Sequence, residues 1–329
     1  MRDFYRCSGS LRRIFFAGVL ALAAGASAQA QQPATNSITV TIQPTTTALP
    51  LVVAEKKGIF AKQGISVKWS VSPVPISDSI ATLGRQIDVM QGTQPALIAA
   101  SGQGIPVVNI TGGALDTKKV PTSNIVARAG SGITSFKQLE GRTVGTLTLT
   151  GNIHFSLLNI LQKEGVNLDS IRWVIGTVPQ LPDLLRAGRV DAIEAIEPFA
   201  TSAIAAGGIA LGDPFRSIGD RAFIGIWLAQ RSWANNNQAV IMRFNTALDE
   251  ATKWISANPA EAREILSSYT GLKGAPLQNT PIPDFHFSTS AEDLGAQQRP
   301  DLQTWLDILK RTSDFKPVKV SDMLPIWTK

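Results

Sequence analysis

Polar side chains suited to hydrogen bonding gather in short loops between the apolar segments of this sequence. Threonine, asparagine and glutamine side chains donate and accept hydrogen bonds but do not by themselves break covalent bonds. We therefore expect these loops to bind a small molecule, and we expect no catalytic residue. The candidate ligand contacts are Gln43, Thr45, Thr46, Ser77, Gln94, Thr111, Thr150, Asn152, His154, Glu197 and Phe223.

Two groups of candidates leave alternatives open. The carboxylate of Glu197 disfavours a purely anionic ligand unless a ligand ammonium, an amidine edge or a nearby arginine pairs with it. The hydroxyls at 45–47 could instead lie in a solvated loop or cap a helix. The ligand could therefore be a mono-anion, a zwitterion or a polar neutral molecule. A sulfonate, a taurine-like zwitterion, an aromatic carboxylate and an aminopyrimidine all fit.

Cysteine and histidine are too scarce to predict a metal site. The single cysteine is Cys7, and the two histidines are His154 and His286. Because Cys7 lies in an N-terminal segment that we expect to be removed, the remaining chain has no disulfide, thiolate ligand or cysteine nucleophile. Ser79 and Ser156 lack the Gly-x-Ser-x-Gly context of a hydrolase nucleophile. We expect no metal ion and no cofactor.

The first 30 residues have the pattern of a secretory signal peptide. A basic start that ends in Arg12-Arg13 precedes an apolar run, 14–26, that is too short to span a bilayer. The paired arginines leave a twin-arginine export route open. Removing this segment takes away four Arg and one Asp, so the net charge falls from +6 to +3. No Lys/Arg-rich run remains, and we expect a periplasmic protein that binds no nucleic acid.

The periodicity of apolar residues places most candidate contacts just after strands or at helix starts. Strands are predicted at 37–42, 65–71, 87–90, 106–110, 124–128, 143–147, 171–175 and 223–229. Helices are predicted at 50–58, 76–83, 95–102, 135–139, 155–164 and 239–257, after Asn258-Pro259 and around 302–309. Residues 271–300 are read as a long surface segment. Ligands of α/β sheets bind beyond the carboxyl ends of strands, where helix N-termini favour polar and anionic groups.

One supersecondary unit occurs twice in the chain, in 78–95 and again in 183–199. In each copy a helical pattern ends at a glycine, an arginine follows, and a short apolar strand carries one aspartate, Asp88 or Asp191. A proline stands seven residues after each aspartate, and the copies are 103 residues apart at these positions. We expect two similar lobes with a cleft between them. Asp88 and Asp191 are interpreted as acceptors for neighbouring backbone N–H groups.

Six segments in a fixed order resemble one protein family. They are AEKKGIFAKQGISV (54–67), LGRQIDV (83–89), LEGRTVG (139–145), GRVDA (188–192), EP (197–198) and NPAEA (258–262), and the resemblance covers about 38–272. The order resembles that of the periplasmic solute-binding proteins of nitrate/sulfonate/taurine ABC transporters, which share their fold with the thiamine-pyrimidine synthase.

The resemblance implies a type II periplasmic binding protein, an α/β fold whose two lobes close around a ligand by a hinge motion. It implies crossover strands near 124–128 and 225–228, lobe 1 from residues 31–125 and 228–329, and lobe 2 from residues 126–227.

The resemblance also implies a function. The protein would capture a small organic solute, such as a sulfonate, taurine-like compound or carboxylate, and deliver it to an ABC permease in the inner membrane. We expect a monomer without enzyme activity. A ligand-sensing module for a membrane receptor is the main alternative. A pyrimidine-synthase-like enzyme is disfavoured, because the cysteine-rich metal motif of that family is absent and the chain is expected to be exported.

Overall fold

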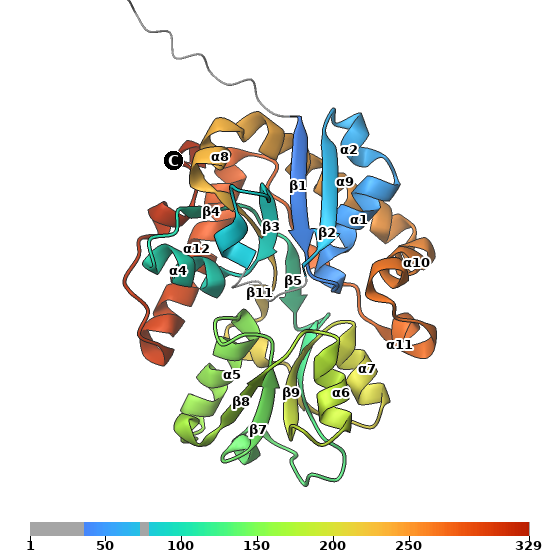
Figure 1. Cartoon of the computed structure of the whole chain (residues 1–329), viewed down its shortest axis with the longest axis vertical. Coiled ribbons are helices and arrows are strands. Elements are labelled where there is room, and N and C mark those ends of the chain that lie inside the picture. The colour runs from blue at the N-terminus through green and yellow to red at the C-terminus, as the bar shows by residue number, and fades with distance from the viewer. Residues whose placement is uncertain (1–35, 73–78, 329) are drawn as a thin grey trace, which may run out of the picture. The chain divides into compact units, whose positions relative to one another are not determined.

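The computed structural model describes residues 36–72 and 79–328, which form two lobes, each built on a five-stranded sheet (Figure 1). The predicted signal peptide and Ser77 lie outside the described residues. The first sheet has the order β2 (Ser66–Val71), β1 (Ser37–Ile42), β3 (Val89–Gly92), β12 (Ile226–Gln230) and β4 (Val107–Thr111). The second has the order β8 (Arg172–Ile175), β7 (Thr143–Thr146), β9 (Ala192–Ile196), β6 (Ser123–Ala127) and β10 (Ile209–Gly212).

The two sheets repeat one topology, as the sequence repeat predicts. β1 pairs in parallel with β2 and β3, and β7 pairs in parallel with β8 and β9. The next strand is antiparallel in both lobes, β12 beside β3 and β6 beside β9. The predicted two-lobed α/β fold is therefore confirmed, whereas the residue boundaries of the lobes stay a prediction.

The two repeated aspartates bind backbone N–H groups of the neighbouring strand, as expected. Asp88 Oδ2 accepts from the N–H of Thr39 at 2.8 Å, and Asp191 Oδ2 accepts from the N–H of Thr143 at 3.0 Å. Each contact links the residue just before one strand, β3 or β9, to the neighbouring parallel strand, β1 or β7. The same side chain therefore sets the strand register in both lobes.

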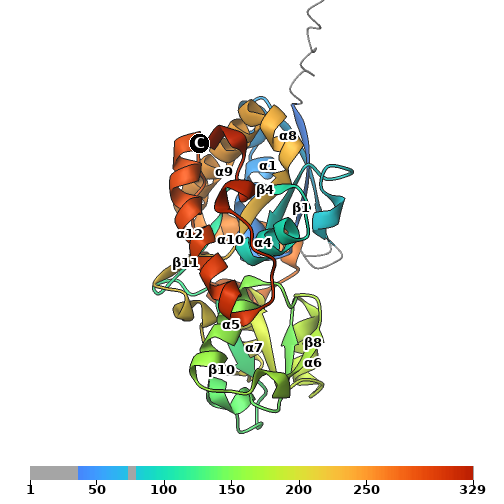
Figure 2. The ribbon, with the colours of Figure 1, turned by 90° about the vertical axis from the view of Figure 1, so that its left-hand side faces the viewer.

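Helices cover both sheets. Around the first sheet lie α1 (Leu49–Lys56), α2 (Ile59–Lys62), α4 (Gln94–Gly102), α8 (Arg231–Asn236), α9 (Gln238–Ala257), α10 (Pro259–Thr270), α11 (Gly274–Asn279) and α12 (Ala291–Thr312). Around the second lie α5 (Asn152–Lys163), α6 (Gln180–Arg186) and α7 (Phe199–Ala205). The apolar stripe of the predicted helix 239–257, formed by Val240, Phe244, Leu248, Ala251 and Ile255, is buried in α9. Phe244 stacks on Phe60 with ring centroids 5.6 Å apart. Helix α12 runs down one side of the molecule to α5 (Figure 2).

Short helical turns of the 3-10 type complete the fold. They are η1 (Thr46–Ala48), η2 (Ile80–Thr82), η3 (Phe136–Leu139), η4 (Leu168–Ser170), η5 (Pro214–Ser217), η6 (Val320–Met323) and η7 (Ile326–Thr328). Among the helices of 36–72 and 79–328, none combines the length and apolar composition needed to cross a bilayer.

Two predictions about elements were wrong. Residues 271–300 hold α11, β13 (Asp284–Phe285) and the first half of α12, which continues through Pro300. The predicted strand 223–229 is two strands, because β11 (Arg221–Phe223) joins a three-stranded sheet with β5 (Ala114–Thr117) and β13, and β12 joins the first sheet. The predicted helix 76–83 lies partly outside the described residues; within the described part Ser79 is helical and the 3-10 turn η2 follows it.

Candidate functional site

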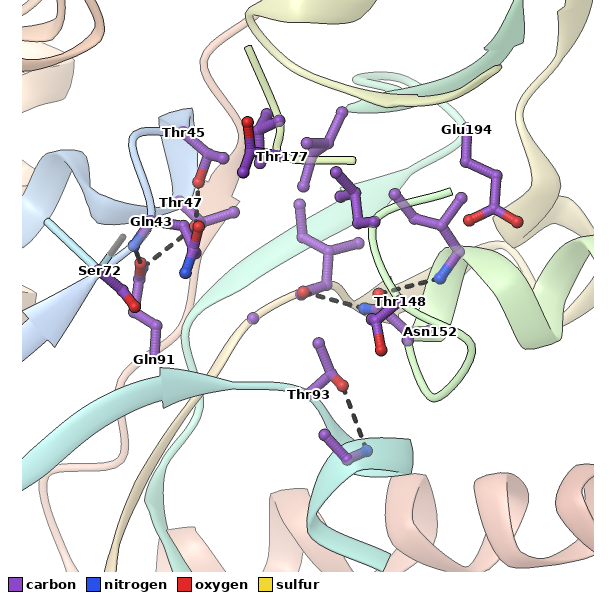
Figure 3. Close-up of a pocket in the computed structure, with 18 of the residues that line it drawn as sticks. Gln43, Thr45, Thr47, Ser72, Gln91, Thr93, Thr148, Asn152, Thr177 and Glu194 are labelled. Atoms are coloured by element: carbon purple, nitrogen blue, oxygen red, sulfur yellow. Dashed lines mark hydrogen bonds between the residues drawn. The ribbon is translucent and has the colours of Figure 1, made fainter. Parts of the chain in front are cut away.

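A cavity of about 260 Å³ lies where parallel strands of both sheets end (Figure 3). Its walls come from the loops after β1, β2 and β3 in lobe 1 and after β7 and β8 in lobe 2, and from β9. The lining residues are Gln43, Pro44, Thr45, Thr47, Val71, Ser72, Gln91, Gly92, Thr93, Ala96, Leu147, Thr148, Gly151, Asn152, Ile153, His154, Gly176, Thr177, Val178, Pro179, Glu194, Ile196, Ile224 and Gly225.

Two helices begin at this cavity. Thr93 caps α4 and accepts a hydrogen bond from the N–H of Ala96 at 3.3 Å. Helix α5 begins at Asn152, whose Nδ2 donates to the Ile224 carbonyl at 2.9 Å. Because the first N–H groups of a helix have no intrahelical partner, both ends favour hydrogen-bond acceptors. The Asn152 contact also fixes the start of α5 to the segment between β11 and β12.

A chain of hydrogen bonds forms part of the lobe 1 wall (Figure 3). The Gln43 N–H donates to Gln91 Oε1 at 3.0 Å, and Gln91 Nε2 donates to Thr47 Oγ1 at 3.1 Å. Thr47 Oγ1 lies 2.7 Å from Thr45 Oγ1. Behind this wall, the Tyr269 hydroxyl donates to the Thr45 carbonyl at 2.8 Å. These contacts hold the hydroxyls in fixed positions at the cavity.

A carboxylate and a histidine form part of the lobe 2 wall. Glu194 is 1% exposed, and its Oε1 lies 2.9 Å from His154 Nδ1. Glu194 Oε2 accepts from the hydroxyl of Thr146 at 2.6 Å. The His154 ring packs edge-on against Trp173, with centroids 4.4 Å apart. Among the described residues that line the cavity, these two are ionisable and none is Lys or Arg.

The structure brings four of the predicted ligand contacts together at this cavity: Gln43, Thr45, Asn152 and His154. Six others lie outside its lining: Thr46, Gln94, Thr111, Thr150, Glu197 and Phe223. Thr111 Oγ1 accepts from the Ser288 N–H at 2.8 Å, which is a contact inside lobe 1. The Gln94 side chain is fully buried in α4, and Phe223 is buried at the end of β11. Thr150 Oγ1 lies 3.1 Å from Thr148 Oγ1.

Glu197 binds the chain on both sides of the lobe boundary. Its carbonyl accepts from the Thr46 N–H at 3.2 Å, and its carboxyl accepts from the N–H and hydroxyl of Thr201 at 3.1 and 3.0 Å. Burial raises the pKa of the Glu197 carboxyl to about 7, although the two hydrogen bonds from Thr201 act in the opposite direction. The Glu197 carboxyl therefore accepts hydrogen bonds from the first turn of α7.

Several lining residues were missed by the sequence reasoning. Gly176 and Thr177 follow a predicted strand, so the rule used for the other loops would have included them. Glu194 is the one charged residue of a strand that is otherwise Ala and Ile, and all of that strand is buried. A buried carboxylate needs a hydrogen-bond or ionic partner, and this requirement is the feature of the sequence that could have identified Glu194 as a site residue.

Residues 45–262 match the model of the NMT1/THI5-like family. The chain belongs to this family. It is 26% identical over 300 residues to the 4-amino-5-hydroxymethyl-2-methylpyrimidine phosphate synthase of Aspergillus parasiticus, which covers 85% of this chain and 84% of that relative.

Solved structures share the fold of this NMT1/THI5-like protein. The alkanesulfonate-binding protein of Xanthomonas axonopodis pv. citri bound to MOPS superposes with a TM-score of 0.72 at 16% identity, over 90% of this chain and 98% of that one. The periplasmic nitrate-binding protein of Synechocystis PCC 6803 gives 0.63 at 13% identity, over 88% and 91%. The predicted resemblance and the periplasmic-binding-protein fold are both confirmed.

Proposed function

We propose that this protein is the solute-binding component of an ABC importer and works in the periplasm. The observation that carries the proposal is the composition of the cavity wall, which takes strand ends from both sheets. A ligand there contacts both lobes, so its binding favours the closed arrangement over an open one. The likeness in fold to sulfonate-binding and nitrate-binding proteins supports the same function.

We further propose that the ligand is an amino-substituted heterocycle of the aminopyrimidine class. Glu194 offers a buried acceptor, which suits ligand N–H donors, and no Lys or Arg among the described lining residues offers a countercharge for a sulfonate or nitrate. Leu147, Ile153 and Val178 offer apolar surface for a ring. A curated relative named for an aminopyrimidine phosphate supports the same ligand class.

An enzyme is the second candidate function. The identity to a pyrimidine phosphate synthase favours it, and so does a histidine held by a carboxylate at the cavity. Against it, the chain has no cysteine besides Cys7 and therefore lacks a cysteine-rich metal motif. Mass spectrometry of ligand incubated with the protein separates the two functions, because a binding protein returns the ligand unchanged.

The test of the binding function is calorimetry on protein purified from the periplasm of an expression host. The ligands are 4-aminopyrimidine, an alkanesulfonate, taurine and nitrate. We expect 4-aminopyrimidine to bind and Glu194→Gln to weaken it at least about ten-fold, because a charge-assisted hydrogen bond is lost. Glu197→Gln, which alters a buried carboxyl outside the cavity lining, is the matched control and keeps the affinity. Tighter binding of the sulfonate or nitrate would reject the proposed ligand class.

A further inference from the structure

The side-chain amide of Gln91 has only one possible orientation. A backbone N–H can only donate, so the Gln91 atom that faces the Gln43 N–H at 3.0 Å must be the oxygen. The amide nitrogen then faces Thr47 Oγ1 at 3.1 Å and donates to it. The ambiguity between amide oxygen and nitrogen that affects many glutamines is resolved here by the obligatory donor.

The orientation of Gln91 favours one donor in the contact between Thr47 and Thr45. Thr47 Oγ1 accepts from Gln91 and lies 2.7 Å from Thr45 Oγ1, a contact in which either hydroxyl can be the donor. Because a hydroxyl that accepts a hydrogen bond becomes a stronger donor, the bond from Gln91 favours Thr47 as the donor to Thr45. When Thr47 donates to Thr45, the proton of Thr45 has no acceptor among the residues of 36–72 and 79–328. Thr45 lines the cavity, and the hydroxyl of Tyr269 donates to its carbonyl at 2.8 Å. With Thr47 as the donor, the proton of Thr45 is left to turn towards the ligand space.

We propose that Gln91, acting through Thr47, makes the Thr45 hydroxyl a hydrogen-bond donor to the ligand. Gln91 and Thr47 are then positioning residues, and Thr45 touches the ligand. This inference rests on the proposed function, since it assumes that the cavity holds the ligand. It also predicts how the ligand is oriented: a hydrogen-bond acceptor of the ligand, such as a ring nitrogen or carbonyl, lies at Thr45 in lobe 1. Its N–H donors face Glu194 in lobe 2.

The substitution Gln91→Glu tests this prediction because it changes polarity with little change of shape. The new carboxylate still accepts from the Gln43 N–H but cannot donate to Thr47. Thr47 must then donate to the carboxylate, and Thr45 donates to Thr47. The Thr45 hydroxyl would present lone pairs to the cavity and prefer a ligand donor. Gln91→Met removes the hydrogen bond to Thr47, and so the relay from Gln91 through Thr47 to Thr45, without adding a buried charge. The inference can therefore still be tested if Gln91→Glu does not fold.

Neutron diffraction from perdeuterated, ligand-free crystals of the wild-type protein tests the relay without any ligand. We expect the Thr47 deuterium on the line to Thr45 Oγ1 and the Thr45 deuterium directed into the cavity. A Thr45 deuterium directed at Thr47 would overturn the inference, whatever the ligand is.

Calorimetry with 4-aminopyrimidine and aniline tests the consequence for specificity, because both carry an amino group and only the first has ring nitrogens. We expect the wild type to prefer 4-aminopyrimidine at least about ten-fold, the usual effect of an unpaired buried hydroxyl. Thr45→Val should weaken 4-aminopyrimidine and leave aniline nearly unchanged. Gln91→Met should reduce the preference and Gln91→Glu should abolish or reverse it.

A preference that is unchanged in all three variants overturns the inference while leaving the proposed function standing. A wild type that binds neither probe rejects the ligand class, and the neutron experiment then decides the relay alone.

Discussion

At the scale of single residues, Glu197 holds two parts of the fold through different atoms. Its main-chain carbonyl accepts from the Thr46 N–H of lobe 1, and its carboxyl accepts from Thr201 in α7 of lobe 2. The carboxyl is buried, and burial raises its pKa to about 7 because the charged form is poorly solvated there. A carboxyl that titrates near neutral pH makes the stability of the protein depend on pH.

We expect Glu197→Gln to flatten the pH dependence of stability. The folded state holds the Glu197 proton more tightly than the unfolded state, whose pKa is near 4.5. The stabilising contribution is therefore complete below pH ~4.5 and is lost as pH rises through about 7, a change on the order of 2 kcal/mol between pH 5 and pH 8. Urea unfolding of wild type and variant at both pH values measures it. Equal slopes in the two proteins would contradict the expectation.

Some residues of the cavity could be identified from the sequence, and others could not. Asn152 could be found because it follows a strand and opens a helix, a position that loop rules identify. Thr111 also comes directly after a predicted strand, but no helix begins there, and its hydroxyl accepts from Ser288 inside lobe 1. Glu194 was missed because it sits inside a strand, whose partner His154 is brought to it only by tertiary packing.

At the scale of elements, the repeated aspartates allow one device to be tested twice. Asp88→Ala and Asp191→Ala each leave a strand N–H without its side-chain acceptor, so we expect each to cost about 1–2 kcal/mol of unfolding free energy. The sites belong to different lobes, so the double variant should equal the sum within about 0.5 kcal/mol. Chemical denaturation measures all three. Asn at either position keeps an acceptor and is the matched control, and an Asn variant as unstable as the Ala variant would contradict this role.

Elements were predictable where local patterns are long and continuous. The stripe of α9 and the paired units around Asp88 and Asp191 fall in this class, because period and glycine position agree with the final packing. The first half of α12 was not predicted because residues 271–300 are rich in Gly, Pro, Gln and Thr, which are typical of surface segments. Burial of Leu302, Trp305 and Leu309 holds its second half in place. Strand β13 has two residues, too few for a period to be recognised.

At the scale of the whole molecule, one arginine contacts both chain segments that pass between the lobes. Arg216 Nη1 donates to the carbonyls of Gly219 and Asp220, which lead into β11, at 2.9 and 2.7 Å. Its Nη2 donates to Asp116 of β5, and its Nε donates to Asp213 at 2.7 Å. Asp116 also accepts from the Thr122 N–H at the start of β6. In the proposed closure of the lobes, we infer that this cluster holds the two crossover segments together at the pivot.

Removing the arginine should destabilise the whole molecule more than a surface pair does. Arg216→Met leaves Asp116, which is fully buried, without its cation, so we expect a loss of about 3 kcal/mol in urea unfolding. Arg186→Met is the matched control, because its partner Asp183 is 68% exposed and such pairs contribute less than about 1 kcal/mol. Adding Asp116→Asn to Arg216→Met removes the buried charge and should restore part of the loss.

Small-angle X-ray scattering of the ligand-free Arg216→Met protein should show a wider range of lobe separations than wild type. If both arginine variants lose equally little stability and scatter alike, the pivot lies elsewhere in the crossover segments.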